Sequence, residues 1–359
     1  MRIGIVIYGS LDTLTGGFLY DRKFVSYFRS KGHDVKVFSL PWRNYPSHLA
    51  DNYRKDFLSN LASARLDILI QDELNHPSLV RLNRKLKQKI RYPIISIVHH
   101  LRCSEQRSKF MNGIYRFVEG AYLSTLDGMI YNSNTTRKAV RALDLGARPG
   151  VVAHPGRDGI RENVDDDYVS KRAHADGPLR ILFVGSVIPR KELHTLIKSL
   201  SRLPRGEWLL DIVGSFKVDR NYSKLVTKLI EANRLEESVN ALGPLDPVDL
   251  ARRYMENHVL AVPSSYEGFG IVYLEAMGFG MPSIGSNVGA AHEIITNSVN
   301  GFLVSPGDEE AIYKTLDMLS RDRDRLAQMG QAALRRYRVH PTWDQSAEKA
   351  LEFVKEMVR

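Results

Sequence analysis

The chain has 359 residues, of which 43% are hydrophobic, and its 51 lysines and arginines against 41 acids give a formal net charge of +10. This length exceeds what one hydrophobic core usually serves, so we expect two domains, and the positive charge favours anionic partners. A single cysteine, Cys103, excludes an internal disulfide framework and indicates a reducing, cytoplasmic environment. Because no apolar run is long enough, we expect neither a signal peptide nor a transmembrane helix.

The first half of the chain alternates short apolar runs with amphipathic stretches. This rhythm predicts a parallel sheet covered by helices, and buried parallel strands should be continuously apolar, as these runs are. Helical patterns stand at Phe18–Ser30 and Thr135–Leu143. The predicted strands are Ile3–Tyr8, Val35–Leu40, Asp67–Gln71, Ile94–Val98, Gly128–Tyr131 and Val151–His154.

A polar, charged stretch follows, and we interpret Arg161–Pro178 as an interdomain connection. Its three consecutive acids, Asp165 to Asp167, would suit a cation. No second set of ligands stands nearby, so a solvated acidic linker is the favoured interpretation and no metal site is expected.

The same alternation then restarts, which predicts a second doubly wound α/β domain. The sequence therefore divides into a domain over 1–165, a domain over 176–338 and a final amphipathic helix within 339–359. The predicted strands are Leu179–Gly185, Trp208–Val213, Val239–Gly243, Val259–Pro263, Pro282–Ser286 and Gly301–Val304, and the predicted helices are Lys191–Leu203, Tyr222–Asn233, Pro247–Glu256, Ile271–Gly280, Glu309–Arg321, Arg323–Tyr337 and Pro341–Arg359.

The stretch SSYEGFGIVYLEAMGFG holds two acids, Glu267 and Glu275, on either side of a glycine-flanked aromatic. A helix is predicted to begin near Ile271, and its free N–H groups with the adjacent glycines favour a bound phosphate. Each carboxylate can accept two hydrogen bonds from a vicinal diol, as a nucleotide sugar offers on both sides of its diphosphate. The spacing alone fits equally well an ordinary helical acid and an unrelated loop acid.

A second stretch, FVGSVIPRKELHTLIKSL, places Gly185 and Ser186 at the end of the second domain's first strand. Arg190 and Lys191 are predicted to open the next helix, where two cations can neutralise a diphosphate leaving group. A solvated basic pair is the alternative, although cations are slightly unfavourable at a helix N-terminus. Gly214, which follows the next strand, is assigned to the same donor site.

Together these stretches resemble the family-4 retaining glycosyltransferases of GT-B fold, whose hallmark is an E-x7-E motif. Glu267 and Glu275 match its acids, and Lys191 matches the lysine of its phosphate-binding segment. That segment usually has arginine after the glycine, where this chain has Ser186, which leaves open whether Arg190 replaces it. The segments SNTTRKAV and HPGRD and the pair Gly16-Gly17 also resemble the family.

The resemblance implies two Rossmann-like domains facing across a cleft, with the acceptor bound by the first, the nucleotide sugar by the second, and the final helix crossing back to the first. It assigns sugar hydroxyls to Glu267, the ribose to Glu275, and the diphosphate to Lys191 and the backbone of Phe269, Gly270 and Ile271. No metal or other cofactor is required, and the anomeric configuration is retained.

His99 and His100 follow a strand of the first domain, where an imidazole can donate to a sugar hydroxyl. The resemblance favours His99, and a buried structural histidine is the alternative for either. Gly16 and Gly17 fit a loop that contacts donor phosphate or acceptor, and equally a turn that needs glycine.

The stretch RLNRKLKQKIR, Arg81–Arg91, has six cations with apolar residues at helical spacing, as in helices that contact anionic membranes. A solvated helix with an ordinary core face is favoured. Nucleic acid is not expected, because no aromatic and basic stacking platform is present.

The sequence thus predicts a glycosyltransferase that moves a hexose-type sugar from a UDP- or GDP-linked donor to a hydroxyl of a glycan or lipid-linked acceptor, in the cytoplasm or at the inner face of a membrane. The alternatives are a GT-B sugar-nucleotide epimerase and a non-catalytic nucleotide-sugar-binding protein. Without a G-x-G-x-x-G loop after either first strand, a nicotinamide-dependent oxidoreductase is not expected. The base, the sugar, the acceptor and the oligomeric state stay open.

Overall fold

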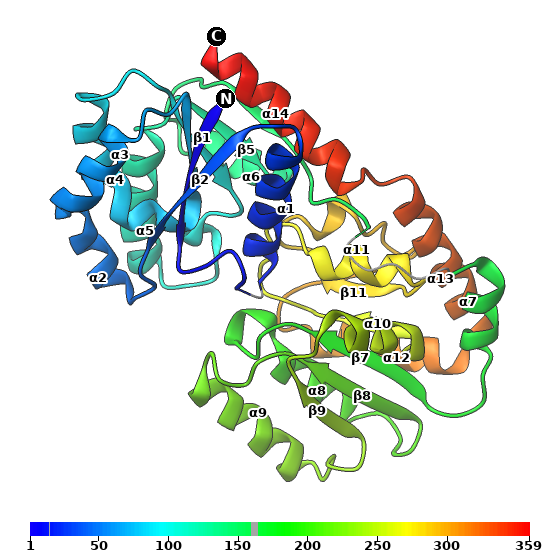
Figure 1. Cartoon of the computed structure of the whole chain (residues 1–359). Helices are drawn as coiled ribbons and strands as arrows, with labels where there is room; N and C mark the ends of the chain where they lie inside the picture. The colour runs from blue at the N-terminus through cyan, green and yellow to red at the C-terminus, as the bar shows by residue number, and fades with distance from the viewer. Residues whose placement is uncertain (14, 159–163) are drawn as a thin grey trace. The chain divides into compact units, whose positions relative to one another are not determined.

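The computed structural model describes residues 1–13, 15–158 and 164–359, which form two compact units (Figure 1). Unit 1 contains residues Met1–Gly156 together with Pro341–Arg359, and unit 2 contains Arg157–His340. In the described ranges, the named strands form two parallel six-stranded sheets, one in each unit. In each sheet, the carboxyl ends of all strands therefore meet at one edge, where ligands of such folds bind.

The sheet of unit 1 has the strand order β2-β1-β3-β4-β5-β6. Ile3 of β1 pairs with Val35 on one side and Ile68 on the other, so β1 is central and its apolar residues are buried. The strands are β1 (Arg2–Tyr8), β2 (Asp34–Leu40), β3 (Ile68–Asp72), β4 (Ile94–Val98), β5 (Gly128–Tyr131) and β6 (Gly150–Val152).

The helices of unit 1 include the last one of the chain. This helix packs against α1 and β6, where Trp343 contacts the ring of Tyr20 edge-on and Gly156 passes close to the Trp343 backbone. A capping box at Thr342 fixes where it begins. The helices are α1 (Gly16–Ser30), α2 (Tyr45–Ala50), α3 (Lys55–Ser63), α4 (His76–Lys87), α5 (Lys109–Leu123), α6 (Asn134–Arg141) and α14 (Trp343–Val358).

The sheet of unit 2 has the order β12-β11-β10-β7-β8-β9. Its strands are β7 (Leu179–Val184), β8 (Trp208–Val213), β9 (Val239–Gly243), β10 (Val259–Ala261), β11 (Ser283–Ser286) and β12 (Gly301–Val304). Its helices are α7 (Asp166–Ala173), α8 (Leu193–Leu200), α9 (Arg220–Ala232), α10 (Pro247–Glu256), α11 (Ile271–Gly278), α12 (Glu309–Arg321) and α13 (Arg323–Arg338).

The predicted connection Arg161–Pro178 is wrong over most of its length. Residues 161–163 lie outside the described residues, but α7 occupies 166–173, buries Val169 and packs against α13. Asp165 caps this helix through the N–H of Tyr168, and its two neighbouring acids pair with basic side chains of α7 and α13. The acidic run is therefore explained by capping and helix ion pairs.

Two helix starts also differ from the prediction. Arg190 and Lys191 lie in a 3-10 turn, Pro189–Lys191, and α8 begins only at Leu193. Gly16 and Gly17 do not precede the first helix but form its first two residues after the cap Thr15. None of the helices in the described ranges has the length and apolar character that a bilayer-spanning segment needs.

Candidate functional site

A glycine follows each of the strands β7 and β8, so their carboxyl ends present backbone without side chains. Gly185 and Gly214 both have positive φ angles, 151° and 149°, and a Cβ on Gly214 would lie 2.0 Å from the Gly185 carbonyl oxygen. The side chain of Lys191 lies against Gly185, where a Cβ would come within 3.2 Å of its Cε. Glycine is therefore needed at both strand ends, and it leaves backbone open beside a lysine.

Lys191 and Arg190 converge on the carboxylate of Glu267. The Lys191 ammonium lies 2.5 Å from Glu267 Oε1, the Arg190 guanidinium lies 3.4 Å from the same oxygen, and the Ser264 hydroxyl donates to it at 2.7 Å. Arg190 also donates to the carbonyl oxygen of Tyr266 at 2.7 Å. The structure thus brings together two cations and one acid that the sequence assigned to one site.

The ionisation of this cluster follows from its burial and its charges. Burial alone would raise the pKa of Glu267, but Lys191, Arg190 and the Ser264 hydroxyl outweigh it and lower that pKa to about 2. Burial lowers the pKa of Lys191, which the charge of Glu267 partly offsets. Glu267 is therefore a carboxylate at neutral pH. The cluster of Lys191, Arg190 and Glu267 has more positive than negative charge.

The loop that holds Glu267 is fixed by backbone contacts. The Glu267 carbonyl oxygen accepts from the N–H of Ala290 at 2.8 Å, and a Cβ on Gly289 would lie 2.2 Å from that oxygen. Gly270, with φ 88°, precedes α11, and a Cβ there would lie 2.3 Å from the ring of Tyr273. Glycines thus allow the loop to turn directly into the N-terminus of α11.

Glu275 lies apart from this cluster. It sits on α11, and its Oε2 accepts a hydrogen bond of 3.0 Å from the hydroxyl of Tyr254 on α10. Burial raises the pKa of Glu275 to about 7, against the Tyr254 hydrogen bond, which lowers it. A carboxyl group whose pKa lies near 7 can donate a hydrogen bond to a ligand hydroxyl when protonated and accept one from it when ionised.

The other predicted donor residues lie on the same loops. The backbone N of Ser186 is 3.2 Å from the position of a Cβ on Gly214, and the ring of Phe269 lies 5.9 Å from that of His340. Ile271 is the first residue of α11 and is half-buried.

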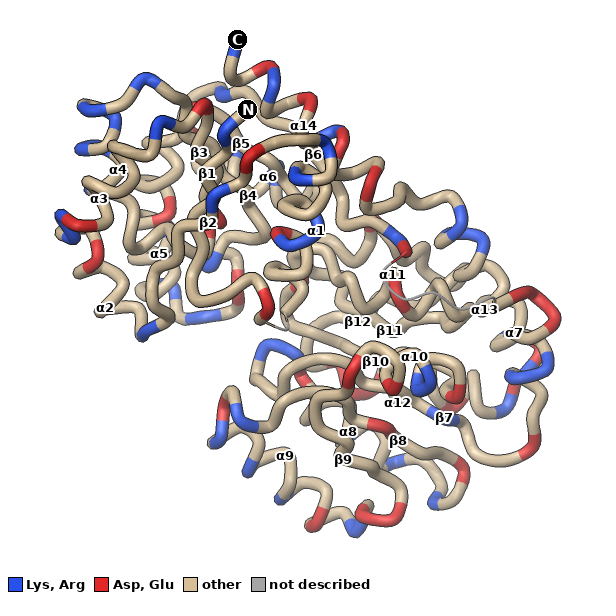
Figure 2. The backbone as a smooth tube through the Cα atoms, in the orientation of Figure 1, with Lys and Arg blue, Asp and Glu red and all other residues tan. Residues whose placement is uncertain are grey.

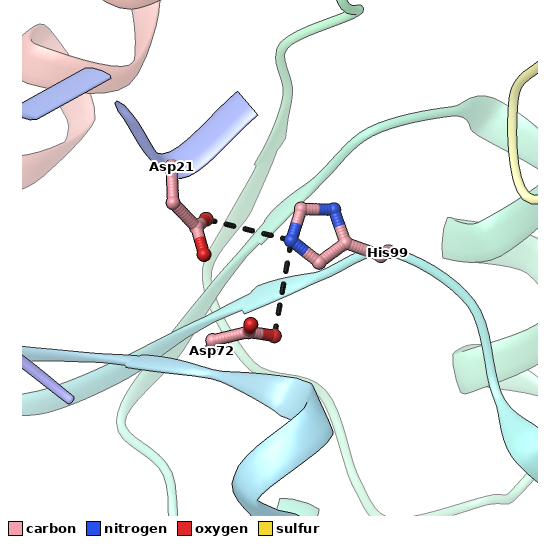
Figure 3. A group of neighbouring side chains, drawn as sticks. All are labelled: Asp21, Asp72 and His99. Carbon is pink, nitrogen blue, oxygen red and sulfur yellow. Dashed lines mark ion pairs between the residues drawn. The ribbon is translucent and has the colours of Figure 1, made fainter. Parts of the chain in front are cut away.

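In unit 1, His99 follows the carboxyl end of β4 and is enclosed by two acids, Asp21 on α1 and Asp72 at the carboxyl end of β3 (Figure 3). Its Nε2 lies 3.4 Å from Asp21 Oδ1 and 3.8 Å from Asp72 Oδ1, and both acids are fully buried. Gly17 lies against the same ring, since a Cβ there would be 3.5 Å from its Cδ2. The structure thus joins His99 to one of the two predicted N-terminal glycines.

Charge balance explains this cluster. Burial lowers the pKa of His99, but the hydrogen bond to Asp21 and the charges of Asp72 and Asp21 raise it overall to about 9. Burial and the charge of Asp21 raise the pKa of Asp72 well above its usual value. His99 is therefore an imidazolium at neutral pH, held in the interior by the buried acids beside it.

Two groups in the described part of the chain have side chains placed to hold a metal ion. In each, the ligand atoms lie within 4.8 Å of one another: one is Asp21, Asp72 and His99, and the other is Glu73, His76 and Glu119. In the second group, Glu119 already accepts the N–H groups of Arg102 and Cys103, so it is a structural acid.

His100 faces a different partner from His99. Its Nε2 lies 3.0 Å from Oε1 of Glu105, and it is only half-buried. Gly16, the first residue of α1, is exposed.

The sequence interpretation missed several residues that complete these clusters. Tyr254, which holds Glu275, and Asp21 and Asp72, which enclose His99, come from separate elements without a local motif. Ser264 stands three residues before Glu267 and donates to its carboxylate. Its signal in the sequence is a hydroxyl close to an acid that needs a hydrogen-bond donor when it is buried.

The second half of the chain is similar to known proteins. Residues 164–336 match the family model described as glycosyl transferases group 1. The D-inositol 3-phosphate glycosyltransferase of Xylanimonas cellulosilytica is 33% identical over 180 residues, which cover 49% of this chain and 42% of that protein. The chain spans less than two thirds of the length of the curated relatives that it matches.

Solved structures resemble the chain over its whole length. Sucrose-phosphate synthase from Thermosynechococcus elongatus has a TM-score of 0.83 at 19% identity, with 99% of this chain and 98% of that chain covered. HepE of Anabaena, solved in complex with UDP and glucose, has a TM-score of 0.77 at 17% identity, with 99% of both chains covered. By these similarities, residues 164–336 resemble the group 1 glycosyl transferases, and the two units of the chain have the Rossmann-like architecture of the GT-B fold.

Proposed function

We propose that the protein is a retaining glycosyltransferase that transfers a hexose-type sugar from a nucleotide diphosphate sugar to a hydroxyl acceptor. One observation carries the proposal: Lys191 and Arg190 converge on Glu267 beside the bare glycine ends of β7 and β8. The match of residues 164–336 to group 1 glycosyl transferases supports it.

The cations of this cluster are proposed to hold the donor diphosphate. A diphosphate beside Gly185 and Gly214 would contact backbone and the Lys191 ammonium, while the α11 N-terminus adds N–H donors. As the bond to the sugar breaks, negative charge develops on the terminal phosphate, and fixed cations stabilise that charge without reorganising. Arg190 is proposed to supply the positive charge that the family pattern places at Ser186.

Glu267 is proposed to accept hydrogen bonds from sugar hydroxyls, and Glu275 from the ribose. In UDP-linked donors both diols are available, and the solved complex of the similar HepE contains UDP and glucose. The acceptor hydroxyl is proposed to attack the same face that the diphosphate leaves and to give its proton to the departing phosphate. This chemistry requires no metal, and His99 is proposed to contact a hydroxyl of the acceptor, which unit 1 is proposed to bind.

A screen of donors tests the function. We expect one of UDP-glucose, GDP-mannose and ADP-glucose to raise the melting temperature, because ligands that bind only the folded state stabilise it by mass action. We also expect release of nucleoside diphosphate that depends on an added hydroxyl acceptor. Conversion of the donor without acceptor would indicate an epimerase, and binding without turnover across a panel of glycan and lipid acceptors would indicate a binding protein.

A further inference from the structure

Helix α5 of unit 1 has apolar side chains on its outer face as well as on its inner one. Tyr115, Glu119, Tyr122 and Leu123 face the interior and are buried. Facing solvent are Phe110, 76% exposed, and Phe117, 78% exposed. A surface helix ordinarily turns its apolar stripe to the core and its polar side chains to water.

The exposed apolar residues form one continuous stripe. Phe110, Ile114 and Phe117 are spaced by four and three residues, so they lie on the same face of the helix. Ile114 is 40% exposed, and Met111 beside it is 37% exposed. Single exposed apolar residues are normal on soluble proteins, but a stripe of this kind marks an interaction surface.

The charges along this stripe have one sign. Within α5, every residue of which the structure describes, the exposed charged residues are Lys109 and Arg116. The one acid of the helix, Glu119, is buried and accepts the N–H groups of Arg102 and Cys103. The outward face is therefore apolar and flanked by cations, which complements an anionic surface.

A lipid surface fits this face better than a protein partner does. A helix of 15 residues is about 22 Å long, and its few apolar side chains are well short of the roughly 800 Å² that a stable protein interface buries on each side. An interfacial helix needs only apolar side chains that reach the acyl boundary and cations at the headgroups. We propose that the outward face of α5 docks on a bilayer that contains anionic lipid.

The neighbouring helix α4, which lies entirely within the described residues, can contribute positive charge to membrane binding, but it has no exposed leucine to insert into the bilayer. It contains residues 81–87 of the basic stretch Arg81–Arg91, but its apolar residues Leu82 and Leu86 are fully buried and α4 packs against α5. Lysines and arginines are spread over both units rather than gathered on this helix (Figure 2). The insertion must therefore come from α5, and this inference stands independently of the sugar-transfer chemistry.

Vesicle co-sedimentation of the full chain tests the inference. We expect binding to vesicles of phosphatidylcholine with phosphatidylglycerol and little binding to phosphatidylcholine alone. The double variant Phe110→Ser with Phe117→Ser should weaken binding by at least about tenfold, because the inserting side chains are lost. Lys109→Gln with Arg116→Gln should reduce the binding to anionic vesicles and its dependence on salt.

The matched control is Val248→Ser with Val339→Ser, which removes two equally exposed apolar residues, 79% and 78%, from unit 2. It should bind vesicles like the unchanged chain, and all variants should keep its melting temperature because the side chains are in solvent. Binding that survives the Phe110→Ser and Phe117→Ser changes overturns the inference. Failure of the unchanged chain to bind vesicles also overturns it. A third contrary result is that the chain self-associates instead of binding vesicles and that the double variant abolishes this self-association.

Discussion

Lys191 is the residue on which the proposed chemistry depends most directly. Lys191→Ala removes the cation nearest to Glu267, while Arg190 and the Ser264 hydroxyl still compensate that buried carboxylate, so the chain should stay folded. We expect turnover to fall by about 100- to 1000-fold, as for loss of a fixed charge-stabilising donor. Release of nucleoside diphosphate measures this.

The control for that change is Lys198→Ala on α8, whose ammonium pairs at the surface with Glu309. It should leave turnover unchanged, because exposed ion pairs contribute little. Equal turnover in Lys191→Ala and Lys198→Ala would remove Lys191 from the mechanism.

The two acids of the E-x7-E motif should separate in their effects. Glu267→Gln loses the charge that Lys191 and Arg190 share and should impair sugar transfer more than binding of the bare nucleotide. Glu275→Gln, beside Tyr254, should mainly weaken nucleotide binding. Calorimetric titration with the nucleoside diphosphate alone distinguishes them, and equal losses of affinity would contradict the division of roles.

The ionisation of His99 should make the free energy of unfolding depend on pH between 6.5 and about 9. Its pKa is raised from 6.5 to about 9 in the folded chain, where Asp21, Asp72, Glu73 and Tyr20 surround it. A raised pKa contributes stability that is present below pH 6.5 and lost as pH rises through 9. The free energy of unfolding should therefore fall more steeply between pH 6.5 and 9 in the unchanged chain than in His99→Gln. Parallel denaturation curves over that range would show that the imidazole does not hold the charge.

At the scale of elements, the turn into α11 depends on glycine. Gly270→Ala places a Cβ at φ 88° and against the Tyr273 ring, whereas Gly307→Ala has a φ of 74° with no neighbour within 4 Å. Gly307→Ala should cost about 1 kcal/mol of stability from conformation alone, and Gly270→Ala at least about twice that. Chemical denaturation measures both, and similar losses would show that the ring of Tyr273 moves aside freely.

Continuous apolar runs made most elements predictable. Ile94–Val98 and Trp208–Val213 are strands over the predicted range, because residues buried on both faces of a parallel sheet leave an unbroken apolar pattern. The short helices α2 and α3 and the capped helix α7 escaped prediction, since a few buried residues in polar surroundings have no clear period.

The candidate site was predictable where its residues follow strands. Lys191 and Glu267 are 76 positions apart, yet both follow strands of one parallel sheet, whose ends must meet. Their direct ion pair was not predictable, because it depends on the reach of side chains across the strand ends. Asp21 lies within a helix, so no pattern in the sequence connects it to His99.

At the scale of the whole molecule, the last helix should decide whether unit 1 folds. Deleting 341–359 removes buried Trp343, Leu351 and Val354 from unit 1, each of which contributes about 1.5–3 kcal/mol when buried. We expect calorimetry to lose the transition of unit 1 and keep that of unit 2, which a bound donor would shift to higher temperature. Two intact transitions in the shortened chain would show that α14 is dispensable.

The chain leaves unit 1 after Gly156 and rejoins it at Pro341. Because synthesis runs from the N-terminus, residues 157–340 are all synthesised before the helix α14 that packs against the first sheet. Domains usually fold in the order in which they emerge. Here unit 2 should complete its core before unit 1, which stays partly formed with apolar surface exposed until residues 341–359 have emerged from the ribosome.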